Sequence, residues 1–233
     1  MFVALIASIA LTQPAPIRRG IPGYPRIAKP ADAAQRRINH RLTLSETSTR
    51  RVARACLDDS TNPTSWQRTI RVTMRGPVFL SYAVEDEVDC GGAHPSTEHS
   101  AVTFDLATGE PVDWPRLLGR LRARLGPMPS DDMVGVVLDS KRLSALYAQR
   151  YDRALTAAGG IPECLGWTKA GAGPFRATMV PWLDARAGGL VLQFDGGNAE
   201  KACSLPVVIP TAVLRREGAS ARLVTALTTA RGR

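Results

Sequence analysis

Apolar and polar residues alternate in several segments, and this is the pattern of half-buried β-strands. Residues 67–74 (QRTIRVTM) alternate in this way, and residues 78–84 repeat the alternation after a Gly-Pro pair. A third run covers residues 101–106, and residues 175–194 have the pattern of two strands around a Gly-containing turn. The segment PVVIP, residues 206–210, predicts a short final strand. The first two strands are expected to pair antiparallel.

Other segments place apolar residues three or four positions apart, which predicts helices. Residues 31–42 and a second stretch, residues 49–57, form a helical element with a basic outer side. Residues 114–126 (WPRLLGRLRARLG) predict a basic amphipathic helix, and residues 140–160 give the clearest helix, with Ser140 as N-cap and two glycines as a stop. We predict an α+β fold in which an antiparallel sheet packs against helices.

The chain is long enough for one sizeable core, so we expect a single domain with flanking segments. Residues 1–12 hold an apolar run that is too short to span a bilayer and suits a secretory signal peptide. No Lys or Arg precedes this run, so a buried N-terminal segment is the alternative. We expect a Pro- and Gly-rich linker over residues 13–23, the folded domain over residues 24–217, and a tail with weak helical character over residues 218–233.

Four cysteines lie far apart and form no C-x-x-C pair, which argues against a zinc knuckle or a redox dithiol. They are Cys56, Cys90, Cys164 and Cys203. In an exported protein they would form two disulfides, for which three pairings exist. We favour Cys56 with Cys90 and Cys164 with Cys203, because one bridge then lies in each half of the chain. Buried free thiols in a cytosolic protein are the alternative.

The formal net charge of +9 raises the question of an anionic partner. Nearly all the positive charge is arginine, spread along the chain with few aromatic residues to stack on bases. We therefore predict no nucleic-acid binding, and we interpret most of this charge as solvated surface. Nor does any segment predict a stable membrane span.

The segment CGGAHPSTEH, residues 90–99, concentrates side chains that are capable of chemistry. A metal ion could use the four ligand types of Cys90, His94, Glu98 and His99. Their spacing differs from the H-E-x-x-H motif, and a proline follows His94 directly. A nucleophilic site would need a G-x-S-x-G elbow or an orienting acid that the sequence singles out, and it has neither. We therefore predict no catalytic residue, no metal and no cofactor.

Three carboxylates, Glu85, Glu87 and Asp89, fall on one face of the predicted second strand. Clustered carboxylates can bind Ca²⁺ or share a proton. The same alternation describes the wet face of a half-exposed sheet, which is the interpretation that we favour.

Two motifs around residues 90–109 resemble those of the RsiV-like domain of unknown function. Its G-G-A-H-G motif is matched by Gly91, Gly92, Ala93 and His94, and its N-F-D-L-x-T-G motif by Phe104, Asp105, Leu106, Thr108 and Gly109. Weaker similarity extends from Tyr24 to Arg216. Pro95 replaces the last glycine of the first motif, and Cys203 stands where the family often has a small residue, so both features are particular to this chain.

Paired glycines before a histidine suit a sharp turn between two strands, and the imidazole can close such a turn with a hydrogen bond. We favour this structural role for His94 over direct ligand contact. If the segment does bind a ligand, we expect the binding residues to be Gly91, Gly92, His94, Glu98 and His99.

The resemblance implies an extracytoplasmic α+β module. In that family the module stands at the outer end of a lysozyme-sensing anti-sigma factor, and beside the catalytic domain of some peptidoglycan deacetylases. We therefore expect a non-catalytic, periplasmic or secreted binding module of the bacterial cell envelope, which recognises a lysozyme-like protein or a cell-wall component. The positive charge disfavours lysozyme, which is usually basic itself. The alternative is a small envelope hydrolase that uses His94, His99 and Glu98, and the oligomeric state is left open.

Overall fold

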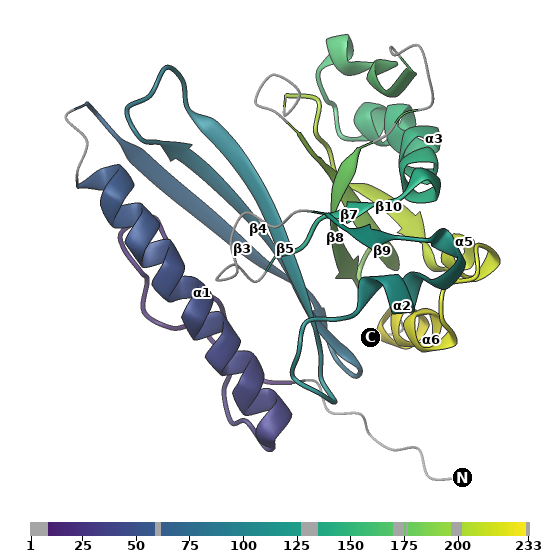
Figure 1. The fold of residues 1–233 in the computed structure, drawn as a ribbon, viewed down its shortest axis with the longest axis horizontal. Coiled ribbons are helices and arrows are strands. Elements are labelled where there is room, and N and C mark those ends of the chain that lie inside the picture. The colour runs from purple at the N-terminus through teal and green to yellow at the C-terminus, as the bar shows by residue number, and fades with distance from the viewer. Residues whose placement is uncertain are drawn as a thin grey trace.

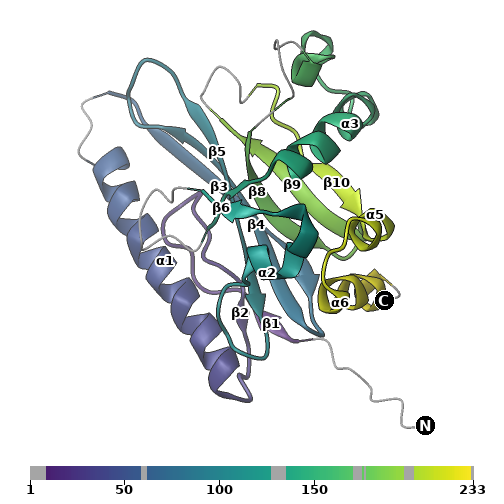
Figure 2. The same cartoon turned by 45° about the vertical axis from the view of Figure 1, so that its right-hand side comes forward.

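Two β-sheets lie face to face between helices in the computed structural model (Figures 1 and 2). The structure describes residues 9–58, 62–126, 135–169, 175, 177–196 and 202–231. The first sheet has the order β3-β4-β5, and the second has the order β10-β9-β8-β7-β6. All the strand pairs within them are antiparallel. The predicted α+β class is confirmed, although the strands form two stacked sheets and a short ribbon rather than one sheet.

The first sheet contains β3 (Ser65–Arg75), β4 (Phe79–Asp89) and β5 (Ser96–Asp105). One of its faces packs against α1 (Ala33–Leu57) through an apolar cluster to which the helix contributes Ile38 and Leu42. The two predicted helical stretches are thus a single helix. It continues between them because its buried polar residues there have partners: Glu46, for example, accepts a hydrogen bond from the Tyr24 backbone N–H at 2.7 Å.

The segment before α1 is packed against the fold. Strand β1 (Leu11–Thr12) pairs with β2 (Arg26–Ile27), and Ile21 between them is fully buried. Residues 13–23, which we expected to be a linker, therefore contribute to the core. A cut after residue 12 would remove β1, whereas residues 1–8 lie outside the described residues.

The second sheet contains β6 (Arg124–Leu125), β7 (Leu138–Asp139), β8 (Thr178–Asp184), β9 (Gly189–Asp195) and β10 (Val207–Pro210). The predicted strand pair within residues 175–194 and the short final strand are confirmed. One face of this sheet packs on the first sheet, where alanines of β4 and β5 meet the larger Val180, Trp182 and Val191. This contact forms the middle of the molecule.

The opposite face of the second sheet carries the remaining helices (Figure 1). Helix α3 (Lys141–Ala157) begins at the predicted N-cap Ser140, whose Oγ accepts from the Leu143 N–H. Two 3₁₀ turns, η2 (Pro162–Cys164) and η3 (Trp167–Lys169), follow it. Helices α5 (Thr211–Arg216) and α6 (Ala221–Arg231) complete this layer.

The helix predicted over residues 114–126 is wrong in length. Helix α2 covers only Trp114–Leu118, the 3₁₀ turn η1 covers Gly119–Leu121, and the chain then enters β6. Gly119 and Arg122 both have positive φ angles, of 51° and 49°, which an α-helix does not accommodate. Part of the prediction is confirmed, since Leu117, Leu118 and Leu121 of the predicted apolar side are buried.

Residues 218–231 are part of the folded body, although we expected a tail from Gly218. Helix α6 places Leu223 and Leu227 in the largest core cluster, and both are fully buried. Arg222 on the same helix forms a bidentate ion pair with Asp105 at the end of β5. The predicted domain boundary at residue 217 is therefore wrong, because the described residues after it belong to the folded domain.

Both predicted disulfides are confirmed. Cys56 near the end of α1 is bonded to Cys90 just after β4, and Cys164 in η2 is bonded to Cys203 before β10. The pairing keeps one bridge in each half of the chain, and the presence of two disulfides fits an extracellular protein. Among the described residues, no helix combines the length and the apolar character that a membrane span needs.

Candidate functional site

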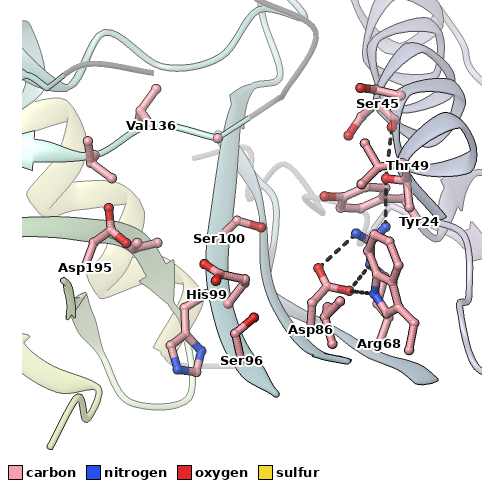
Figure 3. A pocket seen from close by; sticks show the side chains of 18 of the residues that line it. Tyr24, Ser45, Thr49, Arg68, Asp86, Ser96, His99, Ser100, Val136 and Asp195 are labelled. Carbon is pink, nitrogen blue, oxygen red and sulfur yellow. Dashed lines mark hydrogen bonds and ion pairs between the residues drawn. The ribbon is translucent and has the colours of Figure 1, made fainter. Parts of the chain in front are cut away.

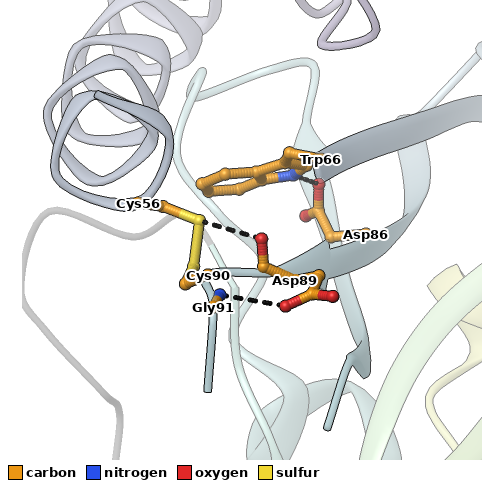
Figure 4. The surroundings of a disulfide bond; sticks show 6 residues. All are labelled: Cys56, Trp66, Asp86, Asp89, Cys90 and Gly91. Carbon is orange, nitrogen blue, oxygen red and sulfur yellow. Dashed lines mark hydrogen bonds between the residues drawn. A yellow bond between two sulfur atoms is a disulfide. The ribbon is translucent and has the colours of Figure 1, made fainter. Parts of the chain in front are cut away.

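The paired glycines lie in the turn between β4 and β5, as predicted. Gly91 has a φ of 76°, a conformation that glycine adopts without strain, and its N–H donates to Asp89 Oδ1 at 2.9 Å. The Asn62 side chain donates to the Gly91 carbonyl at 3.0 Å, and the adjacent disulfide joins the turn to α1 (Figure 4). The turn is thus held by contacts from two sides.

His94 does not close this turn. Its side chain is exposed, and its Nδ1 lies 3.2 Å from the carbonyl of Pro95, the next residue in the chain. A side chain placed at Gly92 would meet no atom within 4 Å, so only the first of the two glycines has a conformational reason to be there. We expected the imidazole to hold the turn, but Asp89 and the disulfide bond do so instead.

Residues 96–99, which we predicted as loop, form the start of β5. Glu98 pairs with Asp86 in the strand register, and His99 pairs with Glu85. The connection between the strands is therefore residues 90–95. Glu98 and His99 line a cavity together with Ser96 and Cys90, whereas Gly91, Gly92 and His94 do not contribute to its lining.

The cavity has a volume of about 370 Å³ and lies where α1, the first sheet and the neighbouring second sheet meet (Figure 3). Figure 3 shows Arg68 and Asp86 on the α1 side of β5, with His99 and Asp195 on the other side. The lining residues are Tyr24, Ser45, Ser48, Thr49, Val52, Trp66, Arg68, Asp86, Val88, Cys90, Ser96, Glu98, His99, Ser100, Gly135, Val136, Val137, Val180 and Asp195. A space of this size suits a small ligand.

A buried ion pair forms the polar side of the cavity. Asp86 Oδ1 accepts from Arg68 Nε at 2.7 Å and from Trp66 Nε1 at 2.6 Å, and Asp86 Oδ2 accepts from Arg68 Nη2 at 2.9 Å. The two charged side chains are only 8% and 10% exposed. Hydrogen bonds between the two partners offset part of the cost of burying such a pair.

Arg68 has hydrogen-bonding capacity left. Its Nη1 donates to Thr49 Oγ1 at 3.0 Å, so the guanidinium uses three of the five N–H groups that arginine carries. The second N–H on each Nη has no acceptor among the described residues. Because Arg68 lines the cavity, a bound oxygen acceptor could satisfy these donors.

Tyr24 adds a second buried polar group beside this pair. Burial raises the pKa of its phenol, an effect that the nearby Arg68 charge and the hydrogen bond with Ser45 only partly oppose. The ring packs edge-on against Tyr82, with 5.6 Å between ring centroids. Tyr24 is therefore held in place as a neutral, hydrogen-bonding wall of the cavity.

The other walls are largely apolar. Val52 of α1, Val88 of β4, Val180 of β8 and the adjacent Val136 and Val137 supply aliphatic surface. Apolar walls with a few well-placed polar groups are typical of binding sites for small molecules. The shape and composition favour binding of a molecule that has both an apolar side and hydrogen-bonding groups.

The arrangement offers little support for nucleophilic or metal chemistry. His99 Nδ1 lies 3.9 Å from Glu85 Oε2, at the limit of an ion pair, and His94 lies outside the cavity lining. In the part of the chain that the structure describes, no three His, Cys, Asp or Glu side chains are grouped so that they could hold a metal ion. Of the three carboxylates assigned to a wet face, Glu87 is exposed while Glu85 and Asp89 are half-buried.

Sequence reasoning missed Arg68, Asp86 and Trp66. A signal for them was available. If Glu85 and Glu87 face solvent, then Asp86 between them must point to the opposite, buried face. A buried carboxylate requires a partner, and Arg68 on the neighbouring predicted strand is a basic residue on its apolar face.

Comparison with known proteins finds similarity in structure but not in sequence. No protein-family model matches the chain, and no curated protein is similar to it in sequence. The similar solved structures include DUF3298 family proteins from Bacteroides fragilis and Pseudomonas aeruginosa, each 14% identical to this chain, with TM-scores of 0.42 and 0.40. The alignments cover 87% and 80% of this chain and 75% and 69% of those chains. Structural similarity at this level of sequence identity and TM-score does not assign a function. The resemblance to the RsiV-like domain therefore stays a prediction.

Proposed function

We propose that the protein is a non-catalytic binding module of the bacterial cell envelope, and that its cavity holds a cell-wall component with an amide carbonyl. N-acetylated sugars and the peptides of the wall carry such groups. The observation that carries the proposal is the buried Arg68, which lines the cavity with two N–H donors unpaired among the described residues. A bound carbonyl oxygen would satisfy them, and leaving buried donors unpaired costs free energy.

The charge balance inside the cavity favours a neutral acceptor over a free anion. Asp86 already neutralises Arg68, and Glu98 and Asp195 place further carboxylates at the lining. An anionic ligand would be repelled by these groups, whereas a carbonyl needs only the N–H donors. The carboxylates could in turn accept hydrogen bonds from ligand hydroxyl or amide groups.

The same proposal includes a periplasmic or secreted location. The two disulfides fit an oxidising compartment, where wall material is accessible. A lysozyme-like protein is a less suitable partner, because the net charge of +9 would repel a basic protein.

Isothermal titration calorimetry with soluble muropeptides, prepared by digestion of peptidoglycan, tests the proposal. Val52 is 50% exposed and lines the cavity, so Val52→Trp should obstruct the mouth and weaken binding at least tenfold. Leu44→Trp is the matched control, because Leu44 lies on the same helix, is 46% exposed and does not line the cavity. Unchanged affinity of Val52→Trp, or no binding by the unmodified protein, would contradict the proposal.

A hydrolysis assay separates the binding module from the alternative envelope hydrolase. The protein is incubated with intact peptidoglycan, and the release of soluble fragments is followed over time. We expect no release. Release that disappears in folded His94→Ala or His99→Ala variants would show that the hydrolase interpretation is the right one.

A further inference from the structure

Positive charge is concentrated on α1. The helix contains six arginines and a single acidic residue, Glu46, and so has a net charge of +5 out of the +9 of the whole chain. Glu46 is buried and forms an ion pair with Arg26 at 2.5 Å. Its charge is therefore already balanced, and the outer side of α1 carries arginines without an acidic residue among them.

The outer side of α1 is a long, convex ridge. Its 25 residues extend over about 37 Å, and Figures 1 and 2 show the first sheet on one side of the helix only. The helical period places a row of exposed side chains along the opposite side. Besides the exposed Thr43 and Thr47, this row, here named the outer stripe, contains Arg36, His40, Leu44, Arg50, Arg51 and Arg54.

Part of the charge in the outer stripe is uncompensated. In the described ranges of the chain, neither Arg36 nor Arg50 forms an ion pair. Arg54 lies near the C-cap Asp58, whose pKa is lowered mainly by its hydrogen bond with Arg18 and to a smaller extent by the Arg54 charge. By contrast, Arg37 and Arg41 on the flank of the helix share Glu110. An exposed apolar residue, Leu44, lies in the middle of the stripe.

We propose that the outer stripe docks on the surface of an anionic phospholipid bilayer. A straight, convex row of guanidinium groups can reach many phosphates of a flat surface at once, and arginine binds phosphate oxygens in a bidentate manner. Leu44 would point into the headgroup layer between the arginines, as apolar residues of interfacial helices do. The inference does not depend on the cavity, because none of the stripe residues lines it.

Co-sedimentation with lipid vesicles tests this inference. The intact, oxidised protein should bind vesicles of phosphatidylcholine with one quarter phosphatidylglycerol, and should not bind pure phosphatidylcholine. Replacing Arg36, Arg50 and Arg54 with glutamine should weaken binding by about fivefold per residue, and on the order of a hundredfold together at low salt. Glutamine has a helix propensity close to that of arginine, so α1 should stay folded, which circular dichroism can check.

A matched control removes the same charge elsewhere. Arg153, Arg186 and Arg215 are exposed and lie on the second-sheet side of the molecule, so their replacement with glutamine should reduce binding far less. Equal loss in both triple variants would show that only net charge matters and would overturn the inference. Equal binding to vesicles with and without phosphatidylglycerol would overturn it as well. So would a stripe variant that binds vesicles normally but has lost binding to DNA in a parallel assay.

Discussion

Replacing Asp86 with asparagine should reveal how strongly the cavity depends on its buried ion pair. The substitution keeps the size of the side chain but removes the charge that balances Arg68, whose side chain is 8% exposed. It also presents an amide N–H₂ to a guanidinium that can only donate, so at least one of the three hydrogen bonds to Asp86 is lost.

The expected cost in free energy of unfolding is about 3–5 kcal/mol, because a buried charge is left without its partner. The chain contains a matched control in the exposed pair of Arg18 and Asp58, whose two hydrogen bonds are both 2.8 Å long. Its side chains are 36% and 45% exposed, so water replaces the lost partner, and Asp58→Asn should change stability very little.

Urea denaturation followed by far-UV circular dichroism, with the disulfides intact, measures both variants. The urea concentration at the unfolding midpoint should be lower for Asp86→Asn and unchanged for Asp58→Asn. The dependence of the unfolding free energy on urea concentration should be similar for the two variants. Replacing both partners, as in Arg68→Met with Asp86→Leu, should recover most of the loss, because no buried charge is then left. If Asp86→Asn is as mild as its exposed counterpart, the pair is hydrated, and our account of the cavity's polar side is wrong.

Three other variants test separate parts of the fold. Removing one bridge with Cys56→Ala and Cys90→Ala frees a loop of 34 residues and should lower stability by about 4 kcal/mol in the chain-entropy model, as urea midpoints would show. Burial tends to raise the pKa of Asp105, but its hydrogen bonds with Arg222 and the backbone hold that pKa below its usual value. Its ionised form therefore stabilises the protein above about pH 4, and this stabilisation is lost on further acidification. Asp105→Asn should make the acid limb of a pH titration of stability shallower, and an unchanged limb would contradict this. Ser140→Ala removes the cap of α3 and should cost about 1–2 kcal/mol, measurable as a lower melting temperature.

Elements with strong local signals were predictable from the sequence. Helix α3 has a serine cap, regular apolar spacing and terminal glycines, and the β8–β9 pair has alternation around a turn with glycine. These signals act over a few residues and do not depend on the rest of the chain. The pairing of the cysteines was favoured among three possibilities because it keeps one bridge in each half of the chain, and the structure has this pairing.

Elements that depend on distant contacts were not predictable in the same way. The leucine spacing of residues 114–126 suits a helix, but Gly119 adopts a positive φ and a carbon added there would meet the Gly218 carbonyl oxygen at 2.7 Å. Helix α6 has a weak amphipathic pattern because the residues outside its buried face are mostly alanine and threonine. Tertiary packing overrides local preference in both places.

The candidate site was predicted in part. The sequence drew attention to residues 90–99, and two of the five expected binding residues, Glu98 and His99, do line the cavity. Arg68 and the walls from α1 and residues 135–137 come from other parts of the chain. Only the three-dimensional arrangement brings them together, and a search for motifs along the sequence has no access to it.

Each disulfide bond joins two segments that lie on the same side of the boundary between the two sheets, and there is one such bond on each side. The first joins α1 to the end of β4, the second joins η2 to the segment between β9 and β10, and none of the four sulfurs bonds across the boundary. Oxidation of each half therefore requires only native contacts within that half. During refolding, correct sulfur pairing can precede association of the halves, whose final orientation is then set by the fit of small alanines against Trp182 and its valine neighbours.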